Sequence, residues 1–316
     1  MSNLEVSGLK SEVQKFWNRL SCDTQVASAP KFSREYFEQI EVFRYRDQPF
    51  VHAFAQFSRY RGKRVIEVGF GAGTDFIQWL RAGASATGVD LTPEALDNLT
   101  HRIGVYQLPA PKQIMVADAE QLPFDSNSFD LGYSFGVLHH SPDTEKAIAE
   151  LVRVVSPGGE IKIMLYNRHS ICVFNQWVKS GLARGKPFQS LSKVLWHHFE
   201  SVGTKAYTRN ELKCIFAKLP LENICVHTEI TSTDYLAASA VPPLNFLYRL
   251  LLRIGGYSWN WNRALFAQAQ TTDAEKPSTP RNEEVIFTGN RFGFFHCITA
   301  NKRHGAAPVR VDQGQY

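Results

Sequence analysis

A glycine-rich turn flanked by acidic residues, EVGFGAGTD at residues 67–75, is the first feature of this sequence that could do chemistry. Its glycines are Gly69, Gly71 and Gly73, and the turn follows a short apolar run that is typical of a buried strand. Glycines let the backbone turn sharply and approach a ligand closely, while the start of the following helix offers free N–H groups. We therefore expect the turn to bind a ligand that carries a nucleoside.

The spacing and the charges of the turn distinguish between two kinds of nucleoside ligand. A dinucleotide site needs Gly-x-Gly-x-x-Gly, whereas Thr74 stands where the last of those glycines belongs. Asp75 places a carboxylate in the first turn of the helix, where it is a poor neighbour for a pyrophosphate. Asp90 follows about twenty residues after Gly69, at the position from which a carboxylate accepts hydrogen bonds from both hydroxyls of a ribose. Together with the negative charge of Glu67, these residues favour adenosine joined to a positively charged amino-acid tail.

His139 and His140, in GVLHHSPD, are the candidate catalytic residues. They come just after a predicted strand, at the edge of the sheet where α/β proteins collect their functional groups. A histidine with a pKa near neutrality suits removal of a proton from a phenol or an activated carbon acid. Adjacent side chains after a strand tend to point in opposite directions, so at most one of the pair should face the pocket, and a structural role stays open for each. Tyr166 and Asn167, at the end of a later strand, could also reach a substrate.

The composition excludes several classes of protein. The 316 residues include 35 Lys and Arg against 30 Asp and Glu, a net charge of +5 without a basic tract, which argues against nucleic acid as a partner. The five cysteines are widely spaced and never form Cys-x-x-Cys, so we expect neither a metal site nor a disulfide framework, and a cytoplasmic location. The first residues lack the pattern of a signal peptide, and no apolar run of about eighteen residues predicts a membrane span.

Alternating strands and helices must position these groups. Two late apolar runs, 223–230 and 293–302, are predicted strands that follow a series of five at intervals of about twenty to thirty residues. The first five predicted strands cover residues 64–69, 86–91, 113–119, 129–136 and 160–167. Such alternation predicts βαβ units and a parallel sheet with helices on both faces. Residues 1–60 show helical spacing of apolar residues, which predicts an N-terminal helical cap before a main domain of residues 61–316.

Two long intervals, 168–222 and 236–290, separate the late strands, and we expect them to be insertions that build a substrate pocket. In the first, Thr208 and Glu211 form a capping box that predicts the start of a helix. In the second, residues 241–266 are amphipathic, basic and rich in aromatic side chains. That segment could cover the pocket or touch a membrane surface, and the pocket is the simpler interpretation.

The sequence between residues 64 and 167 resembles the class I S-adenosylmethionine-dependent methyltransferases, in particular the branch that includes the ubiquinone and menaquinone biosynthesis methyltransferases. The resemblance rests on four blocks in the expected order: EVGFGAGTD, GVDLTPEAL, ADAEQLPFDSNSFDLGYSFGVLHH and ELVRVVSPGGEIKIMLYN. It implies an α/β fold with a Rossmann-like, seven-stranded, mostly parallel sheet of order 3-2-1-4-5-7-6. The last strand of that sheet is antiparallel in this family, which suits the alternation of residues 293–302.

The resemblance also assigns the cofactor-binding residues. In it the backbone from Glu67 through Gly69 and Gly71 to Gly73 cradles the methionine part, with Glu67 near its amino group. Asp90 binds the ribose hydroxyls. The other residues that the resemblance implies are Leu91 against the adenine, Asp118 on the adenine amino group, Ala119 with a backbone N–H to the ring, and Ser134 and Phe135 beside the methionine.

The function expected from this resemblance is methyl transfer from S-adenosyl-L-methionine to a small-molecule or lipid-like acceptor. Two other functions compete with it. A nicotinamide-dependent oxidoreductase has the same fold class, but Thr74 and Asp75 argue against it. A non-catalytic cofactor-binding or scaffold protein would keep the pocket and produce no S-adenosylhomocysteine.

Overall fold

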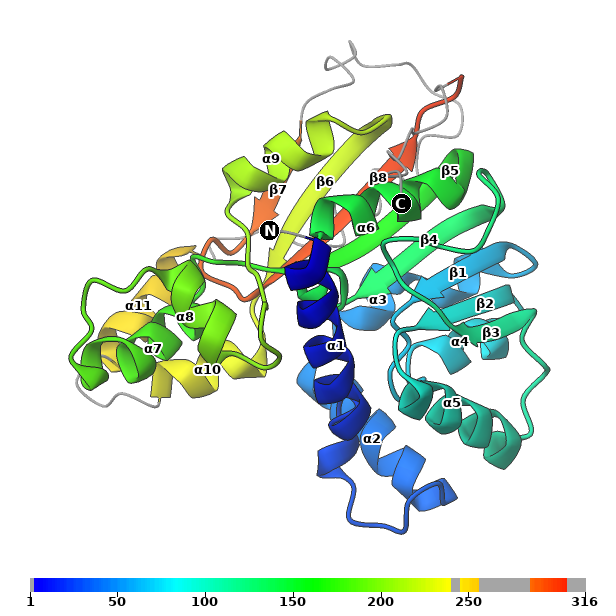
Figure 1. The fold of residues 1–316 in the computed structure, drawn as a ribbon, viewed down its shortest axis with the longest axis horizontal. Coiled ribbons are helices and arrows are strands. Elements are labelled where there is room, and N and C mark those ends of the chain that lie inside the picture. Colours follow the sequence, from blue (N-terminus) through cyan, green and yellow to red (C-terminus); the bar gives the residue numbers. More distant parts are fainter. Residues whose placement is uncertain (1–2, 240–244, 256–284, 306–316) are drawn as a thin grey trace.

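A computed structural model describes residues 3–239, 245–255 and 285–305 of the chain. At its centre lies one sheet of order β3-β2-β1-β4-β5-β8-β6-β7 (Figure 1). The strands are β1 (Arg64–Val68), β2 (Ser85–Asp90), β3 (Gln113–Val116), β4 (Phe129–Phe135), β5 (Val155–Tyr166), β6 (Leu221–Glu229), β7 (Ile286–Gly289) and β8 (Phe295–Lys302). Strands β1 to β5 pair in parallel, whereas β8 runs antiparallel to both β5 and β6.

The order of the seven predicted strands and the antiparallel direction of the last are confirmed, but the predicted number of strands is wrong. An eighth strand, β7, pairs in parallel with β6 at the edge of the sheet. It has only four residues, and Ile286 at its start is 52% exposed. So short an edge strand carries too little apolar periodicity to stand out from the polar interval in which it lies.

Helices cover both faces of the sheet, as predicted. The helices are α1 (Asn3–Arg19), α2 (Arg34–Asp47), α3 (Val51–Ala55), α4 (Phe76–Ala82), α5 (Pro93–Tyr106), α6 (Thr144–Val154), α7 (Ile171–Ser180), α8 (Leu191–His198), α9 (Arg209–Ala217), α10 (Ser232–Ser239) and α11 (Asn245–Gly255). One buried cluster joins the sheet to α3, α4 and α5 and includes Phe54, Trp79 and Leu99. A second cluster joins it to α6 and α9 and includes Leu151 and Phe216. The two clusters are the cores of a three-layer α/β domain.

The N-terminal helices lie over the ends of the first strands. Gln14 of α1 donates a hydrogen bond to the Leu91 carbonyl just after β2, at 2.8 Å. The Tyr45 hydroxyl of α2 donates to the Thr74 carbonyl in the turn after β1, at 3.2 Å. Residues far apart in sequence are thus brought together at the edge of the sheet where strands β1 and β2 end.

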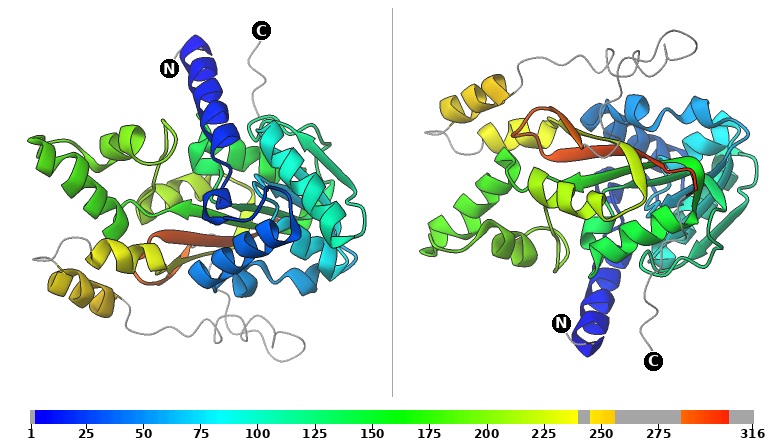
Figure 2. Two further views of the ribbon diagram at one scale, coloured as in Figure 1. Left: turned by 90° about the horizontal axis from the view of Figure 1, so that it is seen from below. Right: turned by 90° about the horizontal axis from the view of Figure 1, so that it is seen from above.

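Helices α7, α8, α10 and α11 lie at the opposite end of the molecule from α5, as both views in Figure 2 show. Helix α9 begins as predicted, because the Thr208 and Glu211 side chains form the reciprocal hydrogen bonds of a capping box. Of residues 241–266, the parts 241–244 and 256–266 lie outside the described residues, and 245–255 form α11. Within the ranges that the structure describes, every helix is too short or too polar to span a membrane.

Candidate functional site

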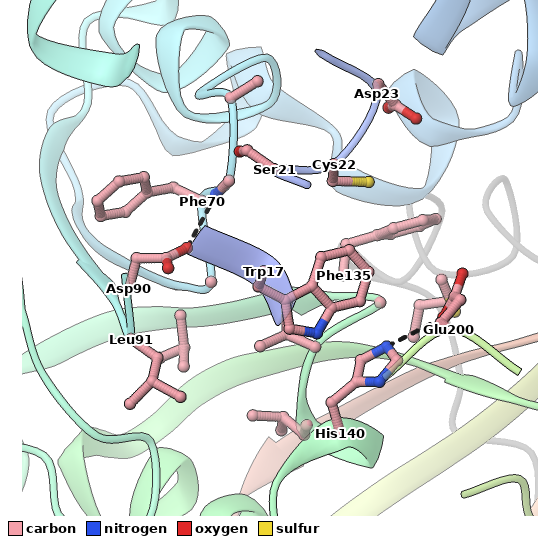
Figure 3. Close-up of a pocket in the computed structure, with 18 of the residues that line it drawn as sticks. Trp17, Ser21, Cys22, Asp23, Phe70, Asp90, Leu91, Phe135, His140 and Glu200 are labelled. Carbon is pink, nitrogen blue, oxygen red and sulfur yellow. Dashed lines mark hydrogen bonds and ion pairs between the residues drawn. The ribbon is translucent and has the colours of Figure 1, made fainter. Parts of the chain in front are cut away.

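A cavity of about 460 Å³ lies where strands β1, β2, β4 and β5 end. Its walls combine the turn after β1 with α1, α2 and the segments that follow β4, α8 and β7. Figure 3 shows Asp90 and Leu91 on one side of it, His140 and Glu200 on the other, and Trp17 of α1 between them. We call the first side the cofactor end and the second the acceptor end. Ligands of α/β sheets bind at this carboxyl edge.

The glycine turn needs glycine for steric reasons. Gly69, Gly71 and Gly73 have φ angles of +81°, +50° and +76°, a region that side chains rarely adopt. A Cβ atom at Gly69 would lie 2.2 Å from the side chain of Val137, and one at Gly73 would lie 2.7 Å from Leu99. Gly69 and Gly71 line the cavity, whereas Gly73 packs away from it.

A buried arginine holds this turn against the helices. Arg102 of α5 is fully buried, and its guanidinium donates to the Ala72 carbonyl at 3.0 Å and to the Thr74 hydroxyl at 2.7 Å. The same group donates to the Phe37 carbonyl of α2 at 3.2 Å and forms an ion pair with Glu41. The backbone at the cofactor end is therefore preorganised by contacts from two helices.

Glu67 lies at the bottom of the cofactor end. It is 3% exposed, lines the cavity and accepts a hydrogen bond of 2.7 Å from the Trp79 indole. Burial raises the pKa of its carboxyl well above the usual range, and the nearby Asp75 raises it further. A cationic group of a ligand would stabilise the ionised form of this carboxyl.

Asp90 and Leu91 line the cavity beside the glycine turn. One Asp90 oxygen accepts from the Gly71 backbone N–H at 3.0 Å, and the other accepts from the N–H and the hydroxyl of Thr92, both at 2.9 Å. Burial raises the pKa of Asp90, although these hydrogen bonds act in the opposite direction. The side chain is therefore fixed in place, and the oxygen that bonds to Gly71 keeps further acceptor capacity for a ligand.

Asp118 and Ala119 also line the cavity, but Asp118 is engaged by the N-terminal helix. The Lys10 ammonium of α1 donates to Asp118 at 2.5 Å and to Glu120 at 2.8 Å. Burial lowers the pKa of Lys10, and the bonds to these two carboxylates outweigh that effect and raise it overall. Helix α1 thus closes this side of the cavity through a charged contact.

Of the two residues predicted at the end of β4, only one reaches the cavity. Phe135 lines it, with the Arg44 guanidinium 4.5 Å from the ring centroid. The Ser134 side chain is fully buried and donates to the Val68 carbonyl at 2.9 Å, which joins β4 to β1. Arg44 also lines the cavity and forms a 2.8 Å ion pair with Asp75, whose carboxylate also accepts from the Tyr133 hydroxyl.

Only one of the two histidine side chains, that of His140, lines the cavity, as the sequence led us to expect. His140 lines it, whereas His139 is fully buried outside the lining and packs against the Tyr166 ring at 3.9 Å between centroids. Burial lowers the pKa of His140 to about 3 and lowers that of His139 well below the usual range. Both imidazoles are therefore neutral near neutral pH.

Several residues at the acceptor end were not predicted. Glu200 lies just after α8 and lines the cavity, with a side chain that is 34% exposed. Burial raises its pKa to about 7. The aromatic residues of this end include Tyr166, which the sequence suggested, and Trp17, Phe199 and Phe294, which it did not. No motif marks these positions, because they come from four separate segments.

Residues 66–163 match the family model described as Methyltransferase domain. The chain has the class I methyltransferase fold. It is 38% identical over 102 residues to a phthiotriol/phenolphthiotriol dimycocerosates methyltransferase of Mycobacterium leprae. The matched segment covers 32% of this chain and 36% of that protein. It is 34% identical over 105 residues to a chloroplastic tocopherol O-methyltransferase of Arabidopsis thaliana, and this match covers 33% of this chain and 30% of that protein. The chain thus matches about a third of the length of these relatives.

Solved structures extend the likeness of the fold over most of the chain. Magnesium protoporphyrin IX methyltransferase of Synechocystis aligns with a TM-score of 0.54 at 13% identity, over 93% of this chain and 100% of its own. Geranyl diphosphate C-methyltransferase of Streptomyces coelicolor, bound to S-adenosyl-L-homocysteine, gives 0.53 at 15% identity, over 93% and 97%. A [4+2]-cyclase, SpnF, gives 0.51 at 13% identity, over 96% and 97%. The same fold therefore carries more than one activity.

Proposed function

We propose that this protein transfers a methyl group from S-adenosyl-L-methionine to a small-molecule or lipid-like acceptor. The observation that carries the proposal is that one cavity contains both the cofactor end, with Glu67, the glycine turn and Asp90, and an aromatic acceptor end. Methyl transfer needs the two substrates in line and away from water, and a shared, largely apolar cavity provides that arrangement. The phthiotriol and tocopherol methyltransferases named above agree with an acceptor of apolar character.

The chemistry of the cofactor end fits a cationic nucleoside. The cavity is lined by seven acidic residues and by two basic ones, Lys10 and Arg44, each of which already pairs with a carboxylate. When bound, the cofactor supplies an electrophilic methyl group on a sulfonium. In our proposal Asp90 binds the ribose hydroxyls, Leu91 packs on the adenine, and Glu67 lies near the amino group of the methionine part.

The remaining roles at the cofactor end follow the same proposal. Gly69 and Gly71 present the backbone to the methionine, and Gly73 allows the turn without touching the ligand. Asp118 and Ala119 bind the adenine, with Lys10 holding the Asp118 carboxylate. Phe135 lies beside the methionine, and Ser134 supports it through the bond to β1.

At the acceptor end we assign His140 to binding of the acceptor and His139 to positioning of Tyr166, on whose ring it packs. A neutral imidazole with a pKa of about 3 is a weak proton acceptor, whereas a carboxyl with a pKa of about 7 can take a proton near neutral pH. Glu200 is therefore the stronger candidate for the general base. The insertions at 168–222 and 236–290 supply Phe199, Glu200 and Leu236 to this end.

Calorimetric titration with S-adenosylmethionine, S-adenosylhomocysteine and NAD in parallel tests the proposal. We expect micromolar binding of the first two ligands and none of NAD, because Asp75 places a carboxylate at the start of α4, where it is a poor neighbour for a pyrophosphate. Binding of NAD alone would support the oxidoreductase instead. A protein that binds S-adenosylmethionine but produces no S-adenosylhomocysteine with any acceptor would be the non-catalytic alternative.

We also propose peripheral membrane contact through α11. Phe246 is 80% exposed and Leu247 is 47% exposed, Arg249 and Arg253 are exposed as well, and Leu251 packs on the core. Aromatic and basic side chains on one short helix suit the surface of an anionic bilayer. Co-sedimentation with phosphatidylglycerol vesicles should decrease for Phe246→Ser and not for Val42→Ser, a change at an exposed apolar position on α2. Equal retention of both variants would contradict this contact.

A further inference from the structure

Two polar side chains of the acceptor end, His140 and Glu200, lie next to each other. The His140 Nε2 atom is 3.3 Å from a Glu200 carboxylate oxygen, and both side chains line the cavity (Figure 3). His140 is 4% exposed, and its Nε2 has no hydrogen-bond partner among the described residues. The charges and partners of these two side chains determine what kind of group they can bind.

Two hydroxyls contact His140 at its Nδ1 atom. The Thr204 hydroxyl donates its hydrogen to the Ser201 carbonyl at 2.7 Å, and its oxygen lies 3.0 Å from Nδ1. The Ser201 hydroxyl lies 3.1 Å from the same nitrogen and can donate to it or accept from it. Nδ1 therefore has a partner in either tautomer, and the neutral ring adds no positive charge beside Glu200.

Among the described residues, Glu200 accepts from one side chain and has no Lys or Arg partner. The Tyr166 hydroxyl donates to its two oxygens at 3.1 and 3.2 Å. None of the Lys and Arg side chains in these ranges forms an ion pair with it, and the nearby Asp23 adds negative charge. A partly exposed carboxylate at the wall of a largely apolar cavity is stabilised by a ligand that brings a cationic donor.

Aromatic rings lie around His140 and Glu200. Tyr166 stacks on Phe294 with 4.2 Å between ring centroids, and Phe199 packs edge-on against Tyr166 at 5.7 Å. The Trp17 ring is 4.9 Å from the His140 ring. The faces of such rings attract cations, and the effect is stronger where water is excluded.

We infer that the acceptor is an amine with an apolar or aromatic body, and that its amino group enters as the ammonium that pairs with Glu200 beside His140. An ammonium carries the positive charge that this carboxylate lacks. The surrounding aromatic rings favour such a cation over a neutral hydroxyl. This inference rests on the proposed methyl transfer and names the class of its acceptor.

The chemical step follows from the same contacts. The ammonium gives one proton to the Glu200 carboxylate and becomes a neutral amine with a free electron pair. That pair forms the new N–C bond to the methyl carbon while the C–S bond breaks and its electrons remain on sulfur. The products are an N-methylated ammonium and S-adenosylhomocysteine, and Glu200 later releases its proton to water.

Calorimetric binding of two probes of matched shape, 2-phenylethylamine and 2-phenylethanol, tests this inference on the full chain, with and without S-adenosylhomocysteine. We expect the wild type to bind the amine at least about tenfold more tightly than the alcohol. Glu200→Gln should remove this preference, since it keeps the shape and loses the charge. Glu38→Gln, a change at an exposed position of α2, should keep it.

The outcomes separate this inference from the proposed function. Equal binding of the two probes, no binding of the amine, or a preference that survives in a folded Glu200→Gln variant would overturn the amine assignment, even if S-adenosylhomocysteine binds. Failure of S-adenosylhomocysteine and S-adenosylmethionine to bind would overturn the methyl transfer. In that case the probes alone, without cofactor, still decide whether this end of the cavity selects a cation.

Discussion

The two ends of the cavity are built in different ways. At the cofactor end, backbone geometry dominates, since three glycines with positive φ and an aspartate at a strand end come from about twenty consecutive residues. At the acceptor end, side chains from four distant segments meet, among them Trp17, Tyr166, Glu200 and Phe294. The first end can change little without loss of the turn, whereas the second can change by single side chains. The contrast suggests that one fold keeps its cofactor and varies its acceptor.

The largest expected effect is at the glycine turn. Gly69→Ala would place a Cβ atom 2.2 Å from Val137 at a φ of +81°, so the turn must move. We expect loss of S-adenosylhomocysteine affinity by about a hundredfold and destabilisation of about 2 kcal/mol or more, measured by calorimetry and by denaturant unfolding. Gly104→Ala on α5, where nothing lies within 4 Å of the added atom, should leave both nearly unchanged. A Gly69→Ala variant with wild-type affinity would contradict the role of backbone geometry.

A smaller effect is expected at the strand end. Asp90→Ala removes the proposed ribose contact and the bond to the Gly71 N–H, so we expect S-adenosylhomocysteine to bind at least about tenfold more weakly by calorimetry. Asp97→Ala, at an exposed position on α5, is the control. Retained affinity in the Asp90 variant would mean that the ribose assignment is wrong.

At the acceptor end, the thermal stability of the wild type and that of the Glu200→Gln variant should depend differently on pH. Burial raises the pKa of Glu200 from the ordinary value of 4.5 to about 7, so its contribution to stability is complete below pH 4.5 and is lost as the pH rises through 7. Thermal unfolding should show the wild type losing about 2 °C or more relative to Glu200→Gln over this range. Parallel melting curves across the range would show that the carboxyl titrates normally.

The smallest effects should distinguish the two histidines. His140→Ala removes the ring that lies between Glu200 and Trp17 at the cavity wall, so we expect the preference for 2-phenylethylamine over 2-phenylethanol to fall several-fold, with S-adenosylhomocysteine affinity unchanged. His139→Ala should change that preference less, because its ring contacts Tyr166 and not the cavity. Equal losses in the two variants would remove the difference in role between them.

The sequence predicted the cofactor end better than the acceptor end for a physical reason. Gly69 and Asp90 are recognisable because only certain residues fit a tight turn and a strand end, and their spacing follows from the βαβ unit. The alternation of strands and helices predicted a parallel sheet, and the order of its main strands was implied by the family resemblance. The short edge strand β7 was not predicted, because its four residues show no clear hydrophobic periodicity.

Glu200 and Ser134 show which side-chain positions local sequence patterns do not predict. Glu200 has a positive φ of 54° and lies after α8 without a motif, and only the fold brings it to His140. Ser134 belongs to a block that the resemblance assigned to the ligand, yet its side chain turns toward β1. Whether a strand residue faces the ligand or the neighbouring strand depends on packing around it.

A crystal structure of the protein with S-adenosylhomocysteine would test the central claim most directly. The account predicts that the ribose hydroxyls bind the Asp90 carboxylate and that the sulfur atom points toward Tyr166 and Glu200. A ligand whose sulfur faces away from the acceptor end, or whose ribose lies elsewhere, would contradict the division of this cavity into a cofactor end and an acceptor end.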